Sequence, residues 1–219
     1  MPEDEVREAF RRMNANNVPL NAEEQRNARY QGDFKWFINR MAESYKESLL
    51  KLGLLSRRDL IRMTDLRLYA EIALTIDEGF LTVKGPQLDK LYRKYNASFE
   101  AAEVFGEKMN YGIKYFIEHE ILHQDVLLRM HVFQSIVVAA ISIKFAEPFE
   151  EQATAAYPLV AQAVQDHNHS LETLVSALRE PDNYPALSEF VKANTSGTNT
   201  GDARAIRFFY FKKALTQVV

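Results

Sequence analysis

The sequence predicts an all-α protein, a multilayer bundle of about nine to eleven helices. Only eight glycines and seven prolines occur in 219 residues, which argues against a loop-rich β fold. Apolar residues instead recur at spacings of three and four, the period of an α-helix with a buried face. Several segments are apolar on two faces, so we expect several layers of helices rather than a simple four-helix bundle.

Capping residues, glycine and proline predict where the helices begin and end. Asn21 precedes a helical run with Glu24 three residues later, the pattern of a capping box, and Ser56 starts a similar pattern. Gly53 and Gly79 suit helix C-termini, where a left-handed backbone favours glycine. The expected helices are 2–13, 22–30, 33–52, 57–78, 88–95, 99–117, 130–145, 150–165, 171–178 and 202–215.

The most apolar segment of the chain is 130–145. A membrane span needs about 20 apolar residues, whereas this run also contains His131, Gln134 and Lys144. We therefore expect a buried core helix, with a strand as the alternative because the segment is rich in β-branched residues.

Three further expectations concern the second half of the chain. The sequence Asn110–Gly112 is expected to kink its helix, and 193–201 (ANTSGTNTG) is expected to be the most mobile loop. The last helix carries four basic residues, which predict a basic face: Arg204, Arg207, Lys212 and Lys213.

Composition limits the possible functions. The chain has no cysteine, which excludes disulfides, thiol nucleophiles and thiolate metal sites. The net charge of −3 gives no global attraction to nucleic acid or anionic membrane. The charged N-terminal residues do not form a signal peptide, so a cytoplasmic location is expected. We expect one compact unit with a softer division between regions 1–97 and 98–219.

The stretch 10–30 is unusually polar for a core helix. It holds four arginines and five asparagines in FRRMNANNVPLNAEEQRNARY. Three sequence blocks within and just after it carry a resemblance. The matching residues are Phe10, Arg12 and Asn14, then Leu20, Asn21, Glu24, Arg26, Asn27 and Ala28, then Tyr30, Gly32 and Phe34.

These blocks resemble the N-terminal family of GmrSD restriction endonucleases, a ParB-like family with an Asp-Gly-Gln-Gln-Arg motif. The resemblance extends through about Asp77, including Arg62–Asp65, and is faint beyond it. The family's Asp-Gly-Gln-Gln-Arg motif lies upstream of these blocks, and neither Asp-Gly-Gln nor Gly-Gln-Gln occurs in this sequence. The resemblance therefore implies the helical C-terminal part of such a protein, without the part that carries the nucleotide chemistry.

The polar residues of the stretch are the first candidate site. The resemblance implies that they line or brace a nucleotide-handling cleft: Arg12, Asn14, Glu24, Arg26 and Asn27. The arginine guanidinium can donate two parallel hydrogen bonds to a phosphate group, and the asparagine amide can position a ligand by paired hydrogen bonds. The alternative is that these side chains lock two short helices and the turn between them together.

A second candidate is the sequence His119-Glu120-Ile-Leu-His123, an HExxH pattern. On a helix this spacing places two histidines on one face for zinc, with the glutamate as general base. His131 or a glutamate further on could be a third ligand. Zinc peptidases have an apolar residue two positions after the second histidine, whereas this sequence has Asp125 there. The alternative to a zinc site is a pair of histidines on the helix surface.

A third candidate is a group of arginines in 57–67. Arg58 and Arg62 share a helix face at i,i+4 and could contact phosphate or an acidic partner. The alternative is a solvated face in which Arg57, Arg58, Arg62 and Arg67 pair with Asp59 and Asp65.

Three functional hypotheses follow from these patterns. The first is a non-catalytic helical module of a GmrSD-like restriction or anti-phage defence protein, which binds another copy, a partner chain or the ParB-like half. It needs no cofactor and no catalytic residue, reaches DNA through its partner and does not enter a membrane. The second is a zinc-dependent hydrolase built on the HExxH pattern. The third is a standalone nucleic-acid or nucleotide binder that uses the Arg/Asn-rich stretch.

Overall fold

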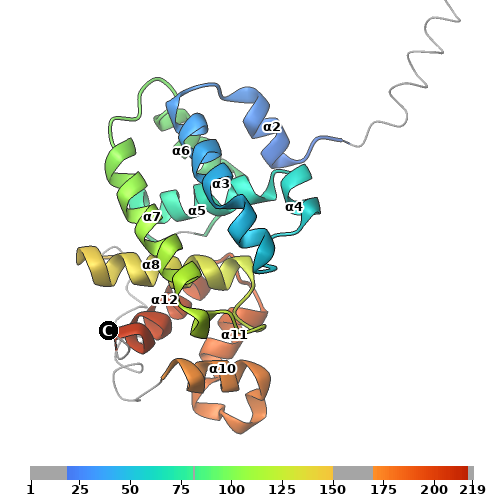
Figure 1. Ribbon diagram of the computed structural model, residues 1–219, viewed down its shortest axis with the longest axis vertical. Helices are drawn as coiled ribbons and strands as arrows, with labels where there is room; N and C mark the ends of the chain where they lie inside the picture. Colours follow the sequence, from blue (N-terminus) through green and yellow to red (C-terminus); the bar gives the residue numbers. More distant parts are fainter. Residues whose placement is uncertain (1–18, 81, 150–169, 217–219) are drawn as a thin grey trace, which may run out of the picture.

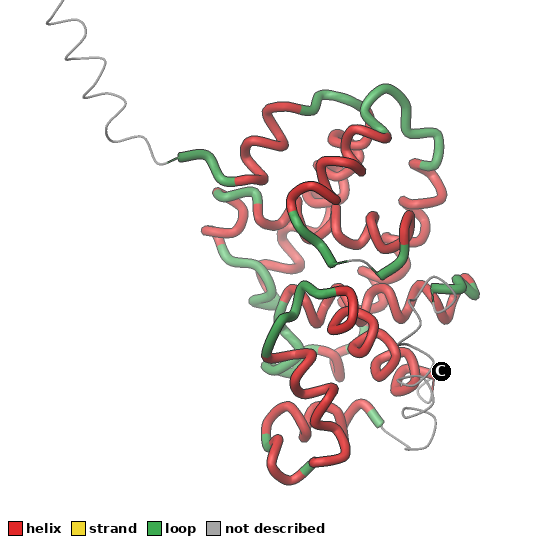
Figure 2. Tube along the Cα trace, turned by 180° about the vertical axis from the view of Figure 1, so that it is seen from behind, coloured by secondary structure: helices red, strands yellow, loops and turns green. Residues whose placement is uncertain are grey.

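The computed structural model describes residues 19–80, 82–149 and 170–216. Within those ranges the chain forms ten α-helices and three short 3₁₀ turns, and no strand (Figure 2). This confirms the predicted all-α class. The α-helices are α2 (Ala22–Arg29), α3 (Asp33–Lys51), α4 (Arg57–Ile61), α5 (Thr64–Glu78), α6 (Gly85–Lys94), α7 (Ala102–Glu118), α8 (Met130–Phe145), α10 (Leu171–Arg179), α11 (Ser188–Thr195) and α12 (Gly201–Thr216).

Helix α8 lies at the centre of the bundle. Figure 1 shows it crossing the molecule, with α2–α7 on one side and α10–α12 on the other. It packs against α5 and α7 from the first group and against α12 from the second. Most of its residues are buried on every side, as predicted for a core helix, and its ends match the prediction. No helix in the described ranges is long and apolar enough to cross a membrane.

The predicted caps of the first helices form. The Asn21 side chain accepts hydrogen bonds from the backbone of Glu23 and Glu24, and the Glu24 carboxylate accepts one from the Asn21 backbone. Ser56 and Asp59 make the same reciprocal cap at α4. These bonds satisfy N–H groups that a helix start otherwise leaves without partners.

Aromatic rings fix α3 against α6 and the loop that follows it. The Phe34 ring meets the Tyr92 ring edge-on at 5.0 Å and the Phe99 ring at 5.1 Å. The Phe37 ring also packs edge-on against Phe99 at 5.1 Å. Edge-to-face pairs at these distances are favourable, which explains the single apolar face predicted for α3.

The single helix predicted over 57–78 is divided in two. Met63 has a left-handed backbone, with φ of 55°, and separates α4 from α5. An L-residue in this conformation cannot continue a right-handed helix. Arg58 and Arg62 lie before this break and remain one helical turn apart, since the Arg62 N–H, at the C-cap of α4, donates to the Arg58 carbonyl oxygen at 3.0 Å.

Helix α7 differs from the prediction at both positions named for it. It runs without interruption through Asn110–Gly112, and it begins at Ala102 with Ala101 rather than Ser98 at the N-cap. Gly112 serves a close helix crossing instead of a kink, since a Cβ added there would lie 2.7 Å from the Val137 carbonyl oxygen of α8. Such a contact is too short for any larger residue.

The C-terminal part contains a helix that the sequence did not predict. Helix α11 covers 188–195, so residues 193–195 of the expected loop are helical. Thr200, rather than the expected Asp202, caps α12, because its hydroxyl accepts the Ala203 N–H at 3.2 Å. The predicted helices at 2–13 and 150–165 lie outside the described residues.

Candidate functional site

Arg26 is enclosed between α2 and α6. Its side chain is 3% exposed, its Nη1 donates to Glu23, and its Nε lies 2.9 Å from Asp89 Oδ1. Its Nη2 also reaches the Gly85 carbonyl oxygen at 3.4 Å. Burial opposes the charge, but the hydrogen bonds and charges of Glu23 and Asp89 raise the pKa of Arg26 above its ordinary value. Every nitrogen of this guanidinium is therefore bonded within the protein.

Glu24 joins α2 to the end of α4. Its Oε2 accepts the Asn21 N–H at 2.7 Å, and its Oε1 lies 3.3 Å from the Arg62 guanidinium. The Asn21 side chain donates to the Arg62 carbonyl oxygen at 2.8 Å. Together with the bonds of Arg26, these contacts hold α2 against α4 and α6.

The structure brings together only part of the first candidate site. Glu24 and Arg26 belong to the same short helix as Asn27, whose side-chain oxygen is buried without a hydrogen-bond partner. Arg12 and Asn14 lie outside the described residues. The polar atoms of Glu24 and Arg26 bond to α4 and α6 of this chain. The alternative that these side chains lock two short helices and the turn between them involves residues 10–18, which lie outside the described residues.

The HExxH pattern does not lie on a helix. Helix α7 ends at Glu118, His119 caps it, and 120–122 forms a 3₁₀ turn. The His119 Nδ1 donates to the Tyr115 carbonyl oxygen at 2.7 Å, and the His123 Nε2 donates to the Phe116 carbonyl oxygen at 3.0 Å. Across the described residues, no three His, Asp or Glu side chains are grouped as a metal site requires. The helical geometry expected for a zinc site was therefore wrong.

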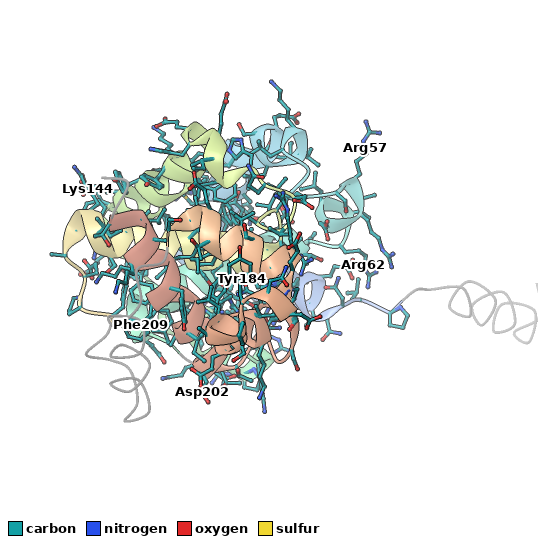
Figure 3. The ribbon with its side chains drawn as sticks, turned by 90° about the horizontal axis from the view of Figure 1, so that it is seen from below. Arg57, Arg62, Lys144, Tyr184, Asp202 and Phe209 are labelled. Atoms are coloured by element: carbon teal, nitrogen blue, oxygen red, sulfur yellow. The ribbon has the colours of Figure 1, made fainter. Side chains whose placement is uncertain are left out.

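The arginines of the third candidate point in different directions. Arg57 projects away from the body of the protein on α4, whereas Arg62 lies nearer to α2 (Figure 3). Arg62 pairs with Glu24, and the Arg67 Nε lies 2.7 Å from Glu71 Oε1. The expected pairing of these arginines with Asp59 and Asp65 is not seen; Asp59 instead caps α4.

A groove lies between α3 and the α4–α5 segment. It has a volume of about 440 Å³ and is lined by Trp36, Asn39, Arg40, Ala42, Glu43, Lys46, Leu60, Met63, Asp65 and Leu66. The Trp36 side chain is half exposed, and Ile61, next to Leu60, is 74% exposed. Exposed apolar residues beside a groove are typical of interaction surfaces.

A buried carboxylate lines this α3–α4 groove. Asp65 is 7% exposed, and its Oδ1 has no hydrogen-bond partner. Burial, together with the Asp59 and Glu43 carboxylates, raises the pKa of Asp65, although its bonds to backbone N–H groups act in the opposite direction. The groove thus contains a buried carboxylate oxygen without a hydrogen-bond partner, together with acidic Glu43 and basic Arg40 and Lys46.

The predicted basic face of α12 was wrong at two of its four positions. Arg204 is 3% exposed and Arg207 is fully buried. Arg204 donates to Glu71 Oε2 at 3.0 Å, to Gln134 Oε1 at 3.1 Å and to Thr75 Oγ1 at 2.7 Å. The sequence signal that was missed is the pair of alanines and the aromatic run around these arginines, which belong to a helix with buried residues on most of its faces.

No protein-family model, curated protein or solved structure matches this chain. The resemblance to the GmrSD N-terminal family therefore rests on the motif residues of the sequence.

Proposed function

We propose that this chain is a non-catalytic helical interaction module of a GmrSD-like restriction or anti-phage defence protein. Its α3–α4 groove docks the ParB-like half, the part that carries the family's Asp-Gly-Gln-Gln-Arg motif. DNA is reached through that partner rather than through this chain.

The observation that carries the proposal is the α3–α4 groove itself. It combines half-exposed Trp36 with the buried, unpartnered oxygen of Asp65. The Lys35 ammonium of this chain already lies 4.3 Å from the centre of the Trp36 ring. A partner's Lys or Arg can still pack its aliphatic stem against the exposed part of this ring and place its charge near Asp65. The exposed Ile61 side chain beside the groove adds apolar surface that is removed from water when a partner binds.

The choice of partner follows from the position of the motif residues. Arg26 and Glu24 hold α2 against α6 and α4, next to the groove. The resemblance places the ParB-like half upstream of these same residues. Helix α2, held in place by these bonds, therefore lies between the α3–α4 groove and the side on which the family's ParB-like half precedes these residues.

The two other hypotheses have less support from the geometry. A nucleotide site at Arg26 would need the guanidinium to leave Glu23 and Asp89, which costs buried ion pairs. A zinc hydrolase would need His119 and His123 on one helical face, whereas the chain turns between them.

The proposal is tested by titrating a purified ParB-like half into this chain and following the heat of binding. Wild type should bind, and Trp36→Glu and Ile61→Glu should each weaken binding at least about tenfold, as expected for central interface residues. Val104→Glu is the matched control, because Val104 is also half exposed but lies on α7. Absence of binding, or equal weakening by all three substitutions, contradicts the proposal. Self-association of the wild type that Trp36→Glu abolishes would assign the groove to a second copy instead.

A further inference from the structure

A second cavity lies on the other side of α5, between α5, α8 and the loop before α12. Its volume is about 310 Å³, and it is lined by Thr64, Arg67, Leu68, Glu71, Met130, His131, Gln134, Thr198 and Asn199. None of these residues belongs to the α3–α4 groove. We name this space the α5–α8 cavity.

The charge around the α5–α8 cavity is unbalanced. Arg67 and Arg204 share a single carboxylate, Glu71, at 2.7 and 3.0 Å. Arg207, fully buried behind them, donates only to neutral oxygens among the described residues: Ser135 Oγ, Ala193 O and Thr198 O. Among the described residues this network holds three arginines and one carboxylate, an excess of two positive charges.

The buried environment does not favour that excess charge. Burial and the nearby Arg204 lower the pKa of Arg207 to about 9, although Glu71 acts in the opposite direction. Arg204 Nε is also buried without an acceptor. A buried charge normally has a countercharge or a full set of hydrogen bonds, and an anion in the α5–α8 cavity would supply the missing negative charge.

Gln134 places an unused donor at this cavity. Its Oε1 accepts from Arg204 Nη1 at 3.1 Å, and an arginine can only donate, so the orientation of the amide is fixed. The Nε2 group therefore points elsewhere, and it is buried with no acceptor in a side chain that is 3% exposed. Buried N–H groups in proteins nearly always have a hydrogen-bond acceptor, so we expect an acceptor for this amide within the cavity.

The start of α8 adds to the same preference. Met130 and His131, in its first turn, line the cavity, and no side chain caps this helix. The positive end of a sixteen-residue helix favours a negative group. His131 donates its Nε2–H to the Asn194 carbonyl oxygen at 3.1 Å, and burial, with Arg207 and Arg129, lowers its pKa to about 4, so that it is neutral at pH 7.

We propose that the α5–α8 cavity binds a small phosphate monoester, with its phosphate held by Arg67, Gln134 Nε2 and the N-terminus of α8. A phosphate dianion carries two negative charges on one group, opposite the two excess positive charges, whereas a dicarboxylate of the same charge, such as succinate, separates them onto two groups. The cavity volume leaves room for a small organic group beside the phosphate. This inference is independent of the docking function proposed for the α3–α4 groove.

Calorimetric titration of the whole chain with glycerol 3-phosphate, inorganic phosphate and succinate tests the proposal. We expect saturable binding of glycerol 3-phosphate at one site per chain, weaker binding of inorganic phosphate, and weakest binding of succinate at equal ionic strength. Arg67→Gln should weaken glycerol 3-phosphate binding about tenfold, the effect of losing one charge-assisted contact. Arg57→Gln is the matched control, because Arg57 has the same charge but projects into solvent on α4 (Figure 3), and it should bind like wild type.

A second variant separates ligand binding from folding. Gln134→Glu places a carboxylate inside the network, so it should raise the unfolding temperature in phosphate-free buffer and abolish glycerol 3-phosphate binding. Three results would overturn the proposal: no saturable binding of either phosphate compound, tighter binding of succinate, or equal affinities in wild type, Arg67→Gln and Gln134→Glu.

Discussion

The pairing of Glu71 with two arginines gives the sharpest stability prediction. Glu71 Oε2 lies 3.0 Å from Arg204 and Oε1 lies 2.7 Å from Arg67, and the Arg204 and Glu71 side chains are 4% and 8% exposed. In Glu71→Gln, an amide N–H₂ must replace one of two acceptor oxygens and face a guanidinium. Arg204 and Arg207 then remain buried without any carboxylate in the described network. Removing one partner of a buried pair costs about 3–5 kcal/mol.

Glu78→Gln is a closely matched control on the same helix. Glu78 pairs with Lys90 at 3.0 Å, but the Lys90 side chain is 68% exposed. An exposed pair contributes less than about 1 kcal/mol. Both substitutions remove one negative charge from α5, so a difference between them cannot come from net charge.

Urea unfolding followed by far-ultraviolet circular dichroism measures both effects. The free energies of unfolding of wild type and the two variants are extrapolated to zero urea, with the same slope against urea concentration for all three proteins. We expect Glu71→Gln to lose about 3 kcal/mol or more and Glu78→Gln less than about 1 kcal/mol. Equal losses in the two variants would refute the assignment of Glu71 as the buried countercharge.

Three further predictions concern Arg26, His131 and the HExxH segment. Arg26→Met should lower the free energy of unfolding by about 2–3 kcal/mol, because Glu23 loses its buried partner, whereas the same change at exposed Arg93 should cost less than about 0.5 kcal/mol; equal losses would argue against the brace. Because the pKa of His131 is lowered to about 4, the unfolded chain binds more protons than the folded chain between pH 6.5 and 4, so stability falls as the pH drops through that window. His131→Gln should reduce the loss of stability between pH 7 and 5 by about 1–2 kcal/mol, measured by urea unfolding at each pH. An unchanged pH profile would count against a neutral, partly buried imidazole. Finally, mass spectrometry of untagged protein should find no zinc that depends on His123; one zinc per chain, lost in His123→Ala, would support the hydrolase hypothesis.

The sequence predicted local structure best where one physical cause dominates. Helix α8 has the predicted ends because its segment is predominantly apolar and stands out from the more polar sequence on either side. The start of α2 was predicted because the capping pattern at Asn21 and Glu24 needs only neighbouring residues. Both features depend on contacts or preferences that are local in the chain.

The errors came from contacts between distant parts of the chain. The left-handed residue Met63 divides a helix that periodicity alone makes continuous. Gly112 was read as a kink because the sequence does not show that Val137 crosses there. Arg204 was expected on a solvated face because nothing local shows its bond to Glu71, 133 residues away.

The same reasoning applies to the two proposed sites. The sequence placed Arg26 and Glu24 in one polar cluster, and the structure adds their partners in α6 and α4. Neither the α3–α4 groove nor the α5–α8 cavity has a contiguous sequence signature, since each is lined by residues from separate helices or loops. Such sites follow from the packing of helices rather than from a motif.

Amide hydrogen exchange of the chain, alone and with a purified ParB-like half, tests the docking function most directly. Interfaces slow the exchange of the backbone that they cover. We predict slower exchange confined to residues 36–46 of α3 and to 60–66, the two sides of the α3–α4 groove. Unchanged exchange at saturating partner, or protection confined to α10 and α11, would contradict the assignment of this groove as the docking surface.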